Sequence, residues 1–197
     1  LRTRPDLDAP DIQLHFVTGL VDDHARRIRL GHGISCHVCV LRPRSRGSVE
    51  LASPDPLVAP RIDPGFFSDP ADLEDMVAGF KITRRLLQAP SLARWLDRAL
   101  FTAGIDDDEA IRDVLRRRCD TVYHPVGSCR MGSDPTSVVD PELRVRGVEG
   151  LRVIDASVMP SLIGGNTNAP TVMIAEKAVD LLRGRSRADA ATAVDAA

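Results

Sequence analysis

The stretch SDPADLEDMVAGFKITRRLLQAP, residues 68–90, predicts the longest helix of the chain and divides it into a strand-rich and a helix-rich part. Ser68 or Asp69 can act as the N-cap, and Pro70 suits the first helical turn. Acidic residues come early and basic residues late, as the helix dipole favours. Apolar residues recur at helical intervals: Leu73, Met76, Val77, Phe80, Leu86 and Leu87. We expect an amphipathic helix that stops at Pro90.

Strands are predicted upstream of this helix. Apolar and β-branched residues alternate at residues 11–17, 34–41 and 47–53, which is the period of a half-buried strand. The polar stretch 22–33 between the first two strands is too long for a tight hairpin, so we expect an excursion over the sheet. The proline-rich segment 52–70 predicts an ordered loop or a sheet edge, because proline cannot donate to a strand ladder.

Helices dominate the sequence downstream. Residues 91–100 and 106–119 read as two further helices, and the second has acids at its start and arginines at its end. A last helix is predicted over residues 170–184, ended by Gly184. Strands gathered first and helices later predict an α+β fold, with a mostly antiparallel sheet and helices packed on one face.

The remaining segments are predicted to be irregular. Residues 120–170 are punctuated by glycine and proline and contain one short predicted strand, LRVID at 151–155. The tail 185–197 has little apolar bulk, and we expect it to be disordered.

Composition excludes several classes of protein. Hydrophobic residues make up 43% and charged residues 27% of the 197 residues, and the net charge is only −2, which argues against a dedicated nucleic-acid or membrane-surface binder. No apolar run approaches the roughly 20 residues that span a bilayer, and the first residues lack the apolar core of a signal peptide. The chain does not begin with Met, and we expect a fragment of a longer protein.

The four cysteines do not predict a metal centre. Cys36 and Cys39 have C-x-x-C spacing, but a strand would point them to opposite faces, whereas zinc needs converging sulfurs. We expect small buried thiols at these positions, and at Cys119 and Cys129. A zinc enzyme that uses Cys36, Cys39 and His124 remains an alternative that metal analysis can test.

His124 is the histidine with the strongest case for chemistry. It lies in TVYHPVGSCRMG, residues 121–132, where Pro125 restrains the backbone and Gly127 leaves one flank uncrowded. Such a loop suits a ligand, although histidines also cap turns without further function. We expect structural roles for the other histidines, which lie in predicted strands or in the charged connector: His15, His24, His32 and His37.

A second candidate is GGNTNAPT, residues 164–171, at the start of the last predicted helix. Its glycines permit a close approach, Asn166 and Asn168 offer donors and acceptors, and Pro170 suits the first turn. The partial positive charge of a helix start can favour a phosphate or an electron-rich ring. The alternative is an Asn N-cap after a flexible loop.

A third candidate is the end of the short predicted strand. Asp155 and Ala156 could present a carboxylate and backbone amides to a polar ligand, or could form only an Asx turn. The chain contains no G-x-G-x-x-G, no G-x-x-x-x-G-K-[ST] and no G-x-S-x-G.

Taken together, three segments resemble a known family. YHPVGSCRMG at 123–132, VVDPELRVRGVEGLRVIDASVMP at 138–160 and GGNTNAPTVMIAEKAVDLL at 164–182 resemble the C-terminal signature region of the glucose-methanol-choline (GMC) flavin-dependent oxidoreductases. Earlier segments resemble the substrate domain of that family, so the likeness covers nearly the whole chain except the tail. Within that family, the chain resembles the bacterial choline dehydrogenases and the acceptor-dependent alcohol dehydrogenases.

The resemblance implies roles for particular residues. It implies a substrate-binding domain at residues 1–119 and a catalytic, FAD-contacting segment at 120–184. His124 would accept the proton of the substrate hydroxyl, and Asn168 would hold the alcohol oxygen. The residues implied along FAD are Asp155, Ala156, Asn166, Pro170 and Thr171.

The resemblance also implies an activity and sets its limits. We expect oxidation of a primary alcohol to the aldehyde by hydride transfer to FAD, with oxygen or a quinone as the final acceptor and no nucleic-acid partner. The glycine fingerprint of the FAD domain is absent from these 197 residues, so we expect the chain alone neither to bind FAD tightly nor to turn over. A non-catalytic binding module on the same scaffold is the alternative. We expect a cytoplasmic protein, and the membrane association of the intact enzyme stays open.

Overall fold

A computed structural model describes residues 1–23 and 26–184 of the chain. The chain forms two compact units, Leu1–Val122 and a second that begins at Tyr123, and each is considered by itself. His24 and the predicted tail 185–197 lie outside the described residues. No helix among the described residues has the length and apolar character that a membrane crossing requires.

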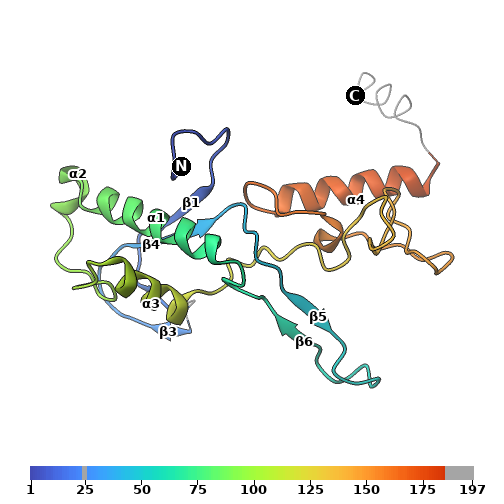
Figure 1. Cartoon of the computed structure of the whole chain (residues 1–197), viewed down its shortest axis with the longest axis horizontal. Helices are drawn as coiled ribbons and strands as arrows, with labels where there is room; N and C mark the ends of the chain where they lie inside the picture. Colours follow the sequence, from blue (N-terminus) through green and yellow to red (C-terminus); the bar gives the residue numbers. More distant parts are fainter. Residues whose placement is uncertain (24–25, 185–197) are drawn as a thin grey trace. The chain divides into compact units, whose positions relative to one another are not determined.

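The first unit is built on an antiparallel pair of strands covered by a helix (Figure 1). β1 (Ile12–Val17) pairs with β4 (Ser35–Val40), and α1 (Pro70–Leu87) packs on one face of the pair. The close approach depends on Gly79 in α1, since a Cβ there would lie 2.8 Å from Val38 Cγ2 and 3.0 Å from Ile12 Cδ1. The predicted α+β arrangement, with antiparallel strands and a helix on one face, is confirmed.

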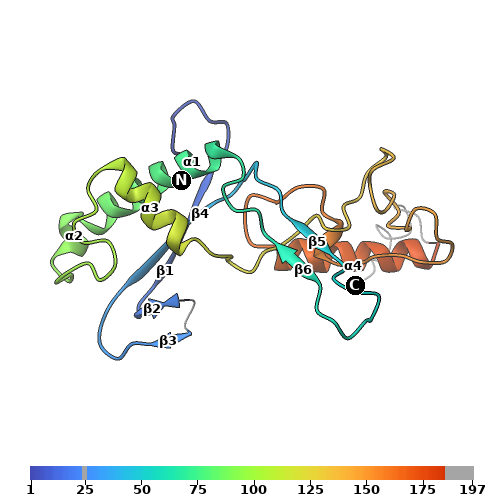
Figure 2. The same ribbon diagram turned by 60° about the horizontal axis from the view of Figure 1, so that its bottom comes forward.

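The predicted excursion between these strands is a small ribbon, β2 (Val21–Asp22) with β3 (Arg27–Ile28), shown in Figure 2. The buried Asp22 fastens it, because its carboxylate accepts hydrogen bonds from Arg29 Nε at 2.7 Å and Arg118 Nη2 at 3.0 Å. Both guanidinium groups also lie over the ring of Phe101, at 5.0 and 4.3 Å from its centroid. One carboxylate therefore joins the connector to the end of the third helix.

The third predicted strand forms its own ribbon. β5 (Ser48–Glu50) pairs with β6 (Arg61–Asp63), which lies in the segment predicted as a loop or a sheet edge. Every residue of both strands is exposed, including Ile62 at 67%. The described strands therefore make three two-stranded ribbons where one sheet was expected, and the prolines around β6 limit the donors available for further pairing.

The N-cap of α1 is one of the two residues that the sequence predicts, and α3 (Asp108–Arg118) begins in a similar way. At the start of α1, the Asp69 side chain accepts from Ala71 N at 2.9 Å, and Pro70 occupies the first turn. At the start of α3, the Asp107 side chain accepts from Ala110 N at 2.8 Å. Both helices follow the preference for an acidic N-cap and for basic residues in the last turn.

Two predicted elements are wrong in extent. The helix expected over residues 91–100 is reduced to α2 (Pro90–Ala93), because Trp95 is 72% exposed and no apolar stripe is buried to hold a longer helix. The strand expected at 151–155 is only an isolated bridge between Arg144 and Arg152. Turns at Gly147 and Gly150, both with positive φ, fold that segment too tightly for a longer ladder.

The second unit packs loops against the last helix, α4 (Asn168–Leu182), which ends before Gly184 as predicted. A short 3-10 turn, η2 (Ala156–Val158), contributes to the same core. The buried residues of this core come from the loops, η2 and α4: Val139, Leu143, Val158, Met159, Ile174 and Ala178. The core thus fixes the start of α4 against the loops that carry the candidate residues.

Candidate functional site

The loop that carries His124 is restrained on both sides of the histidine. Tyr123 has a φ of 63° and Gly127 a φ of 87°, and Pro125 fixes its own φ between them. A non-glycine residue in this left-handed region costs about 1 to 2 kcal/mol, so surrounding contacts must hold Tyr123 there. The His124 side chain itself is half-buried. The loop is therefore stiff while its imidazole keeps access to solvent.

An ion pair joins the end of this loop to the residues that follow it. Arg130 donates from Nη1 and Nη2 to the two carboxylate oxygens of Asp134, at 2.8 and 2.7 Å. These hydrogen bonds, with a further one from Thr136, hold the pKa of Asp134 well below its usual range. The turn after the histidine is consequently pinned by a carboxylate that stays ionised.

The imidazole of His124 is bonded to the start of α4. Its Nδ1 lies 3.0 Å from Oγ1 of Thr167, a residue 43 positions away that is only 8% exposed. Thr167 directly precedes Asn168, so the structure brings the two predicted catalytic residues into one neighbourhood, although the hydrogen bond goes to Thr167. The sequence prediction missed Thr167, whose only signal was its place between the two asparagines.

Backbone hydrogen bonds join the same loop to η2. Cys129 N donates to Ser157 O at 3.1 Å, and Met131 N donates to Val158 O at 2.8 Å. Asp155 is exposed, and its side chain accepts from Ser157 N at 2.8 Å, which is the Asx turn that the sequence left as an alternative. Ala156 is half-buried at the start of η2. The loop and the Asp155 turn are therefore parts of one structure.

The start of α4 presents the other predicted residues. Asn166 and Asn168 are exposed, while Pro170 and Thr171 are half-buried in the first turn. Thr171 donates from its amide and from its hydroxyl to Thr167 O, at 3.0 and 2.7 Å. The helix has no side-chain N-cap hydrogen bond, which differs from the Asn cap considered above. The start of α4 is therefore not capped by the side chain of its N-cap residue, Thr167.

The two cysteines with C-x-x-C spacing do not converge on a common point. Cys36 pairs with Phe16 and Cys39 with Gln13, so the two thiols point to opposite faces as predicted. Burial raises the pKa of both, and it raises the pKa of Cys119 to about 11, which disfavours the thiolate that a metal needs. Within residues 1–23 and 26–184, no three His, Cys, Asp or Glu side chains are grouped to hold a metal ion.

The described histidines of the first unit differ in their burial. His15 faces His37 across the β1/β4 pair, and its Nε2 is buried without a hydrogen-bond partner in the described part of the chain. His32 is exposed in the connector.

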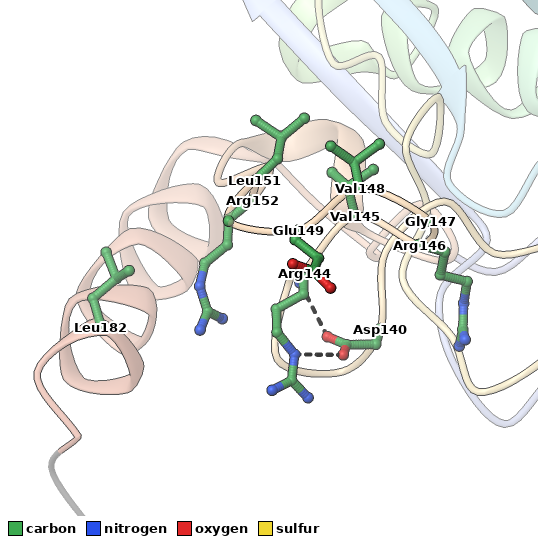
Figure 3. Close-up of a pocket in the computed structure, with 11 residues that line it drawn as sticks. Asp140, Arg144, Val145, Arg146, Gly147, Val148, Glu149, Leu151, Arg152 and Leu182 are labelled. Carbon is green, nitrogen blue, oxygen red and sulfur yellow. Dashed lines mark hydrogen bonds and ion pairs between the residues drawn. The ribbon is translucent and has the colours of Figure 1, made fainter.

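An open groove of about 850 Å³ lies elsewhere in the second unit (Figure 3). Two of its charged lining residues are paired with each other, because Arg144 Nε donates to Asp140 at 2.8 Å. None of the predicted catalytic or cofactor residues lines it. The groove therefore does not compete with the His124 region as the candidate site.

Comparison with known proteins identifies the family of the chain. Residues 43–175 match the family model described as GMC oxidoreductase. The chain is 48% identical to an alcohol dehydrogenase [acceptor] of Pseudomonas putida, over 92% of this chain and 33% of that protein. It is 43% identical to the mitochondrial choline dehydrogenase of Homo sapiens, over 94% of this chain and 32% of that protein.

A solved structure gives the same result. A formate oxidase of Aspergillus oryzae, whose FAD modification has been studied, superposes with a TM-score of 0.83 at 29% identity. The match covers 90% of this chain and 32% of that one. The chain belongs to the GMC oxidoreductase family. It spans about a third of the length of the curated relatives that it matches.

Proposed function

We propose that this chain is the substrate-side and catalytic part of a flavoprotein that oxidises a primary alcohol to an aldehyde. The observation that carries the proposal is the hydrogen bond between His124 Nδ1 and Thr167 Oγ1, which fixes an imidazole at the start of α4. Membership of the GMC family and the names of the relatives support the chemistry. Residues 1–119 would form the substrate domain and residues 120–184 the catalytic segment.

The roles follow from the atoms that must move. An alcohol becomes an aldehyde when its hydroxyl loses a proton and its carbon loses a hydride. His124 would accept the proton at Nε2, the ring nitrogen opposite the one bonded to Thr167, as a general base. Asn168 would donate from its side-chain amide to the alcohol oxygen and so hold it while negative charge develops. FAD, when bound, supplies the acceptor for the hydride.

The residues around the Asp155 turn and the first turn of α4 fit a flavin. The helix start has no side-chain cap, and its positive end suits an electron-rich ring or a phosphate. We propose that the flavin is contacted by five residues of these turns: Asp155, Ala156, Asn166, Pro170 and Thr171. Choline, the substrate named for one relative, would need a compensating carboxylate or an aromatic cage. Oxygen or a quinone would reoxidise the flavin.

The test is an alcohol panel with an artificial electron acceptor, applied to the protein that carries this chain with its flavin-binding part. We expect His124→Ala to lower kcat by about 10² to 10⁴, the usual contribution of a positioned acid or base. The matched control is His32→Ala, which removes an exposed histidine of the first unit and should leave kcat unchanged. Unchanged kinetics in His124→Ala would remove that residue from the mechanism. A flavin-loaded protein that oxidised no alcohol would favour the binding module.

A further inference from the structure

The side chain of Thr167 is not used in the way that its position suggests. Thr167 is the N-cap residue of α4, where a threonine hydroxyl usually accepts a hydrogen bond from an amide of the first turn. Here the helix has no side-chain cap hydrogen bond, and the hydroxyl oxygen lies 3.0 Å from His124 Nδ1. The backbone explains the change, because Thr167 has helical φ and ψ of −88° and −10°, whereas a capping residue is normally extended.

The backbone of Thr167 is held firmly in this place. Thr167 is 8% exposed, and its carbonyl accepts two hydrogen bonds from Thr171, so its backbone belongs to the first turn of α4. One turn further on, Ile174 is buried in the core of the second unit. The backbone that carries the hydroxyl is therefore fixed, and only a change of the χ1 rotamer would take the hydroxyl away from the imidazole. The hydroxyl of Thr167 contacts His124 and does not cap its own helix. This arrangement indicates that a requirement other than the stability of the helix determines its place.

We propose that Thr167 is the positioning residue of His124. Its hydroxyl oxygen accepts the Nδ1–H of the neutral imidazole and thereby keeps the lone pair on Nε2. In a neutral imidazole one nitrogen is a donor and the other an acceptor, and the bond made by one nitrogen decides the state of the other. The opposite arrangement, in which the hydroxyl donates to Nδ1, would place the proton on Nε2 and leave no site for the substrate proton.

The choice of tautomer and its consequence for the reaction both rest on the proposed function, because only a protonated Nδ1 leaves Nε2 free to accept the substrate proton; the contact between Thr167 and His124 does not. When Nε2 accepts the hydroxyl proton, the imidazole becomes a cation whose Nδ1–H still donates to Thr167. The threonine oxygen is uncharged, so it orients the ring without the electrostatic stabilisation that a carboxylate gives in a catalytic triad. We therefore expect a smaller kinetic effect than the loss of the histidine itself.

The first test reads the tautomer directly and needs neither flavin nor turnover. The ¹⁵N shifts of histidine are recorded on the 197-residue chain at a pH where the imidazoles are neutral, and the His124 signals are assigned by their loss in His124→Gln. We expect Nδ1 protonated and Nε2 unprotonated in the wild type and in Thr167→Ser, and a mixture of tautomers in Thr167→Val. A wild-type spectrum with Nε2 protonated would overturn the proposal even if Thr167→Val failed to fold.

The matched control is Thr83→Val. Thr83 is also a buried helical threonine, but its hydroxyl donates to Gly79 O at 2.8 Å within α1. This variant should leave the His124 signals unchanged. If it shifted them as much as Thr167→Val does, the change would report general destabilisation, and the positioning role would be lost.

A second test uses the flavin-loaded protein. We expect Thr167→Val to lower kcat by about 10-fold to 10²-fold, with a smaller change in KM. This is the range found when a residue that orients a metal-bound histidine is lost. We expect Thr167→Ser to restore kcat. A tautomer shift in Thr167→Val with unchanged kinetics in His124→Ala would keep the positioning role and reject the proposed function. A kinetic loss in His124→Ala with no tautomer shift in Thr167→Val would support the proposed function and reject the positioning role of Thr167.

Discussion

At the scale of single residues, two residues beside His124 depart from the local preference of their residue type. Tyr123 is kept at a φ of 63° directly before His124, and the hydroxyl of Thr167 bonds that histidine in place of its own helix. Both departures from local preference occur at the candidate site. Such local conflicts are expected where function constrains a structure more tightly than stability does.

Asp22 provides a prediction at the same scale. The hydrogen bond from Arg29 holds the pKa of Asp22 below its ordinary value of 3.8, against the opposing effect of burial, and Arg118 adds to the shift. A lowered folded-state pKa means that the stabilisation is fully present above 3.8 and is lost as the pH falls through the folded pKa. We therefore expect Asp22→Asn to lower the Tm at neutral pH, and the difference from wild type to shrink in acid.

Thermal melts across this pH range provide the measurement. The exposed Asp97 offers a matched control, since Asp97→Asn should leave the Tm unchanged throughout. A Tm difference for Asp22→Asn that stayed constant into acid would show that the ionised carboxylate is not what fastens the connector.

At the scale of elements, the sequence predicted what local chemistry determines. The boundaries of α1 and α3 follow from acidic caps, and the end of α4 follows from Gly184. The helix expected over residues 91–100 is short because a longer helix would need a partner surface for its apolar residues, and Trp95 and Leu100 remain exposed. The division of the strands into three ribbons, like the contact of Thr167, depends on partners far along the chain.

The β1/β4 and β5/β6 ribbons should differ in local stability. All residues of β5 and β6 are exposed, and an isolated two-stranded ribbon is marginal in water. The β1/β4 pair is covered by α1 and includes the fully buried Ile12. We expect the amides of β5 and β6 to exchange with solvent at least about 10-fold faster than those of β1 and β4, as measured by hydrogen exchange. Equal protection would mean that another surface covers the exposed ribbon in solution.

At the scale of the whole molecule, the chain resembles only part of its relatives. It spans about a third of their length, and its 197 residues contain no G-x-G-x-x-G cradle for a dinucleotide. The residues proposed to contact the flavin lie at turns and at one helix start, which offer few contacts for tight binding. Recognition of the family from the sequence was possible because the signature segments are local, and it is confirmed by the family match.

This gives a prediction for the isolated chain. We expect the 197-residue chain, mixed with FAD and passed through gel filtration, to retain no stoichiometric flavin, because the pyrophosphate cradle is missing from its sequence. Absorbance and fluorescence spectra of the protein fraction make the measurement. A flavin spectrum at a one-to-one ratio would show that the turns of the second unit bind the cofactor by themselves.

The division between Val122 and Tyr123 has a consequence for how such proteins diversify. His124, Thr167 and Asn168 all belong to the second unit. A recombinant chimera that took residues 1–122 from a relative would therefore keep His124 and its hydrogen bond with Thr167. Under the proposed function, we expect exchange at this junction to change the preference for the alcohol while the proposed general base stays the same.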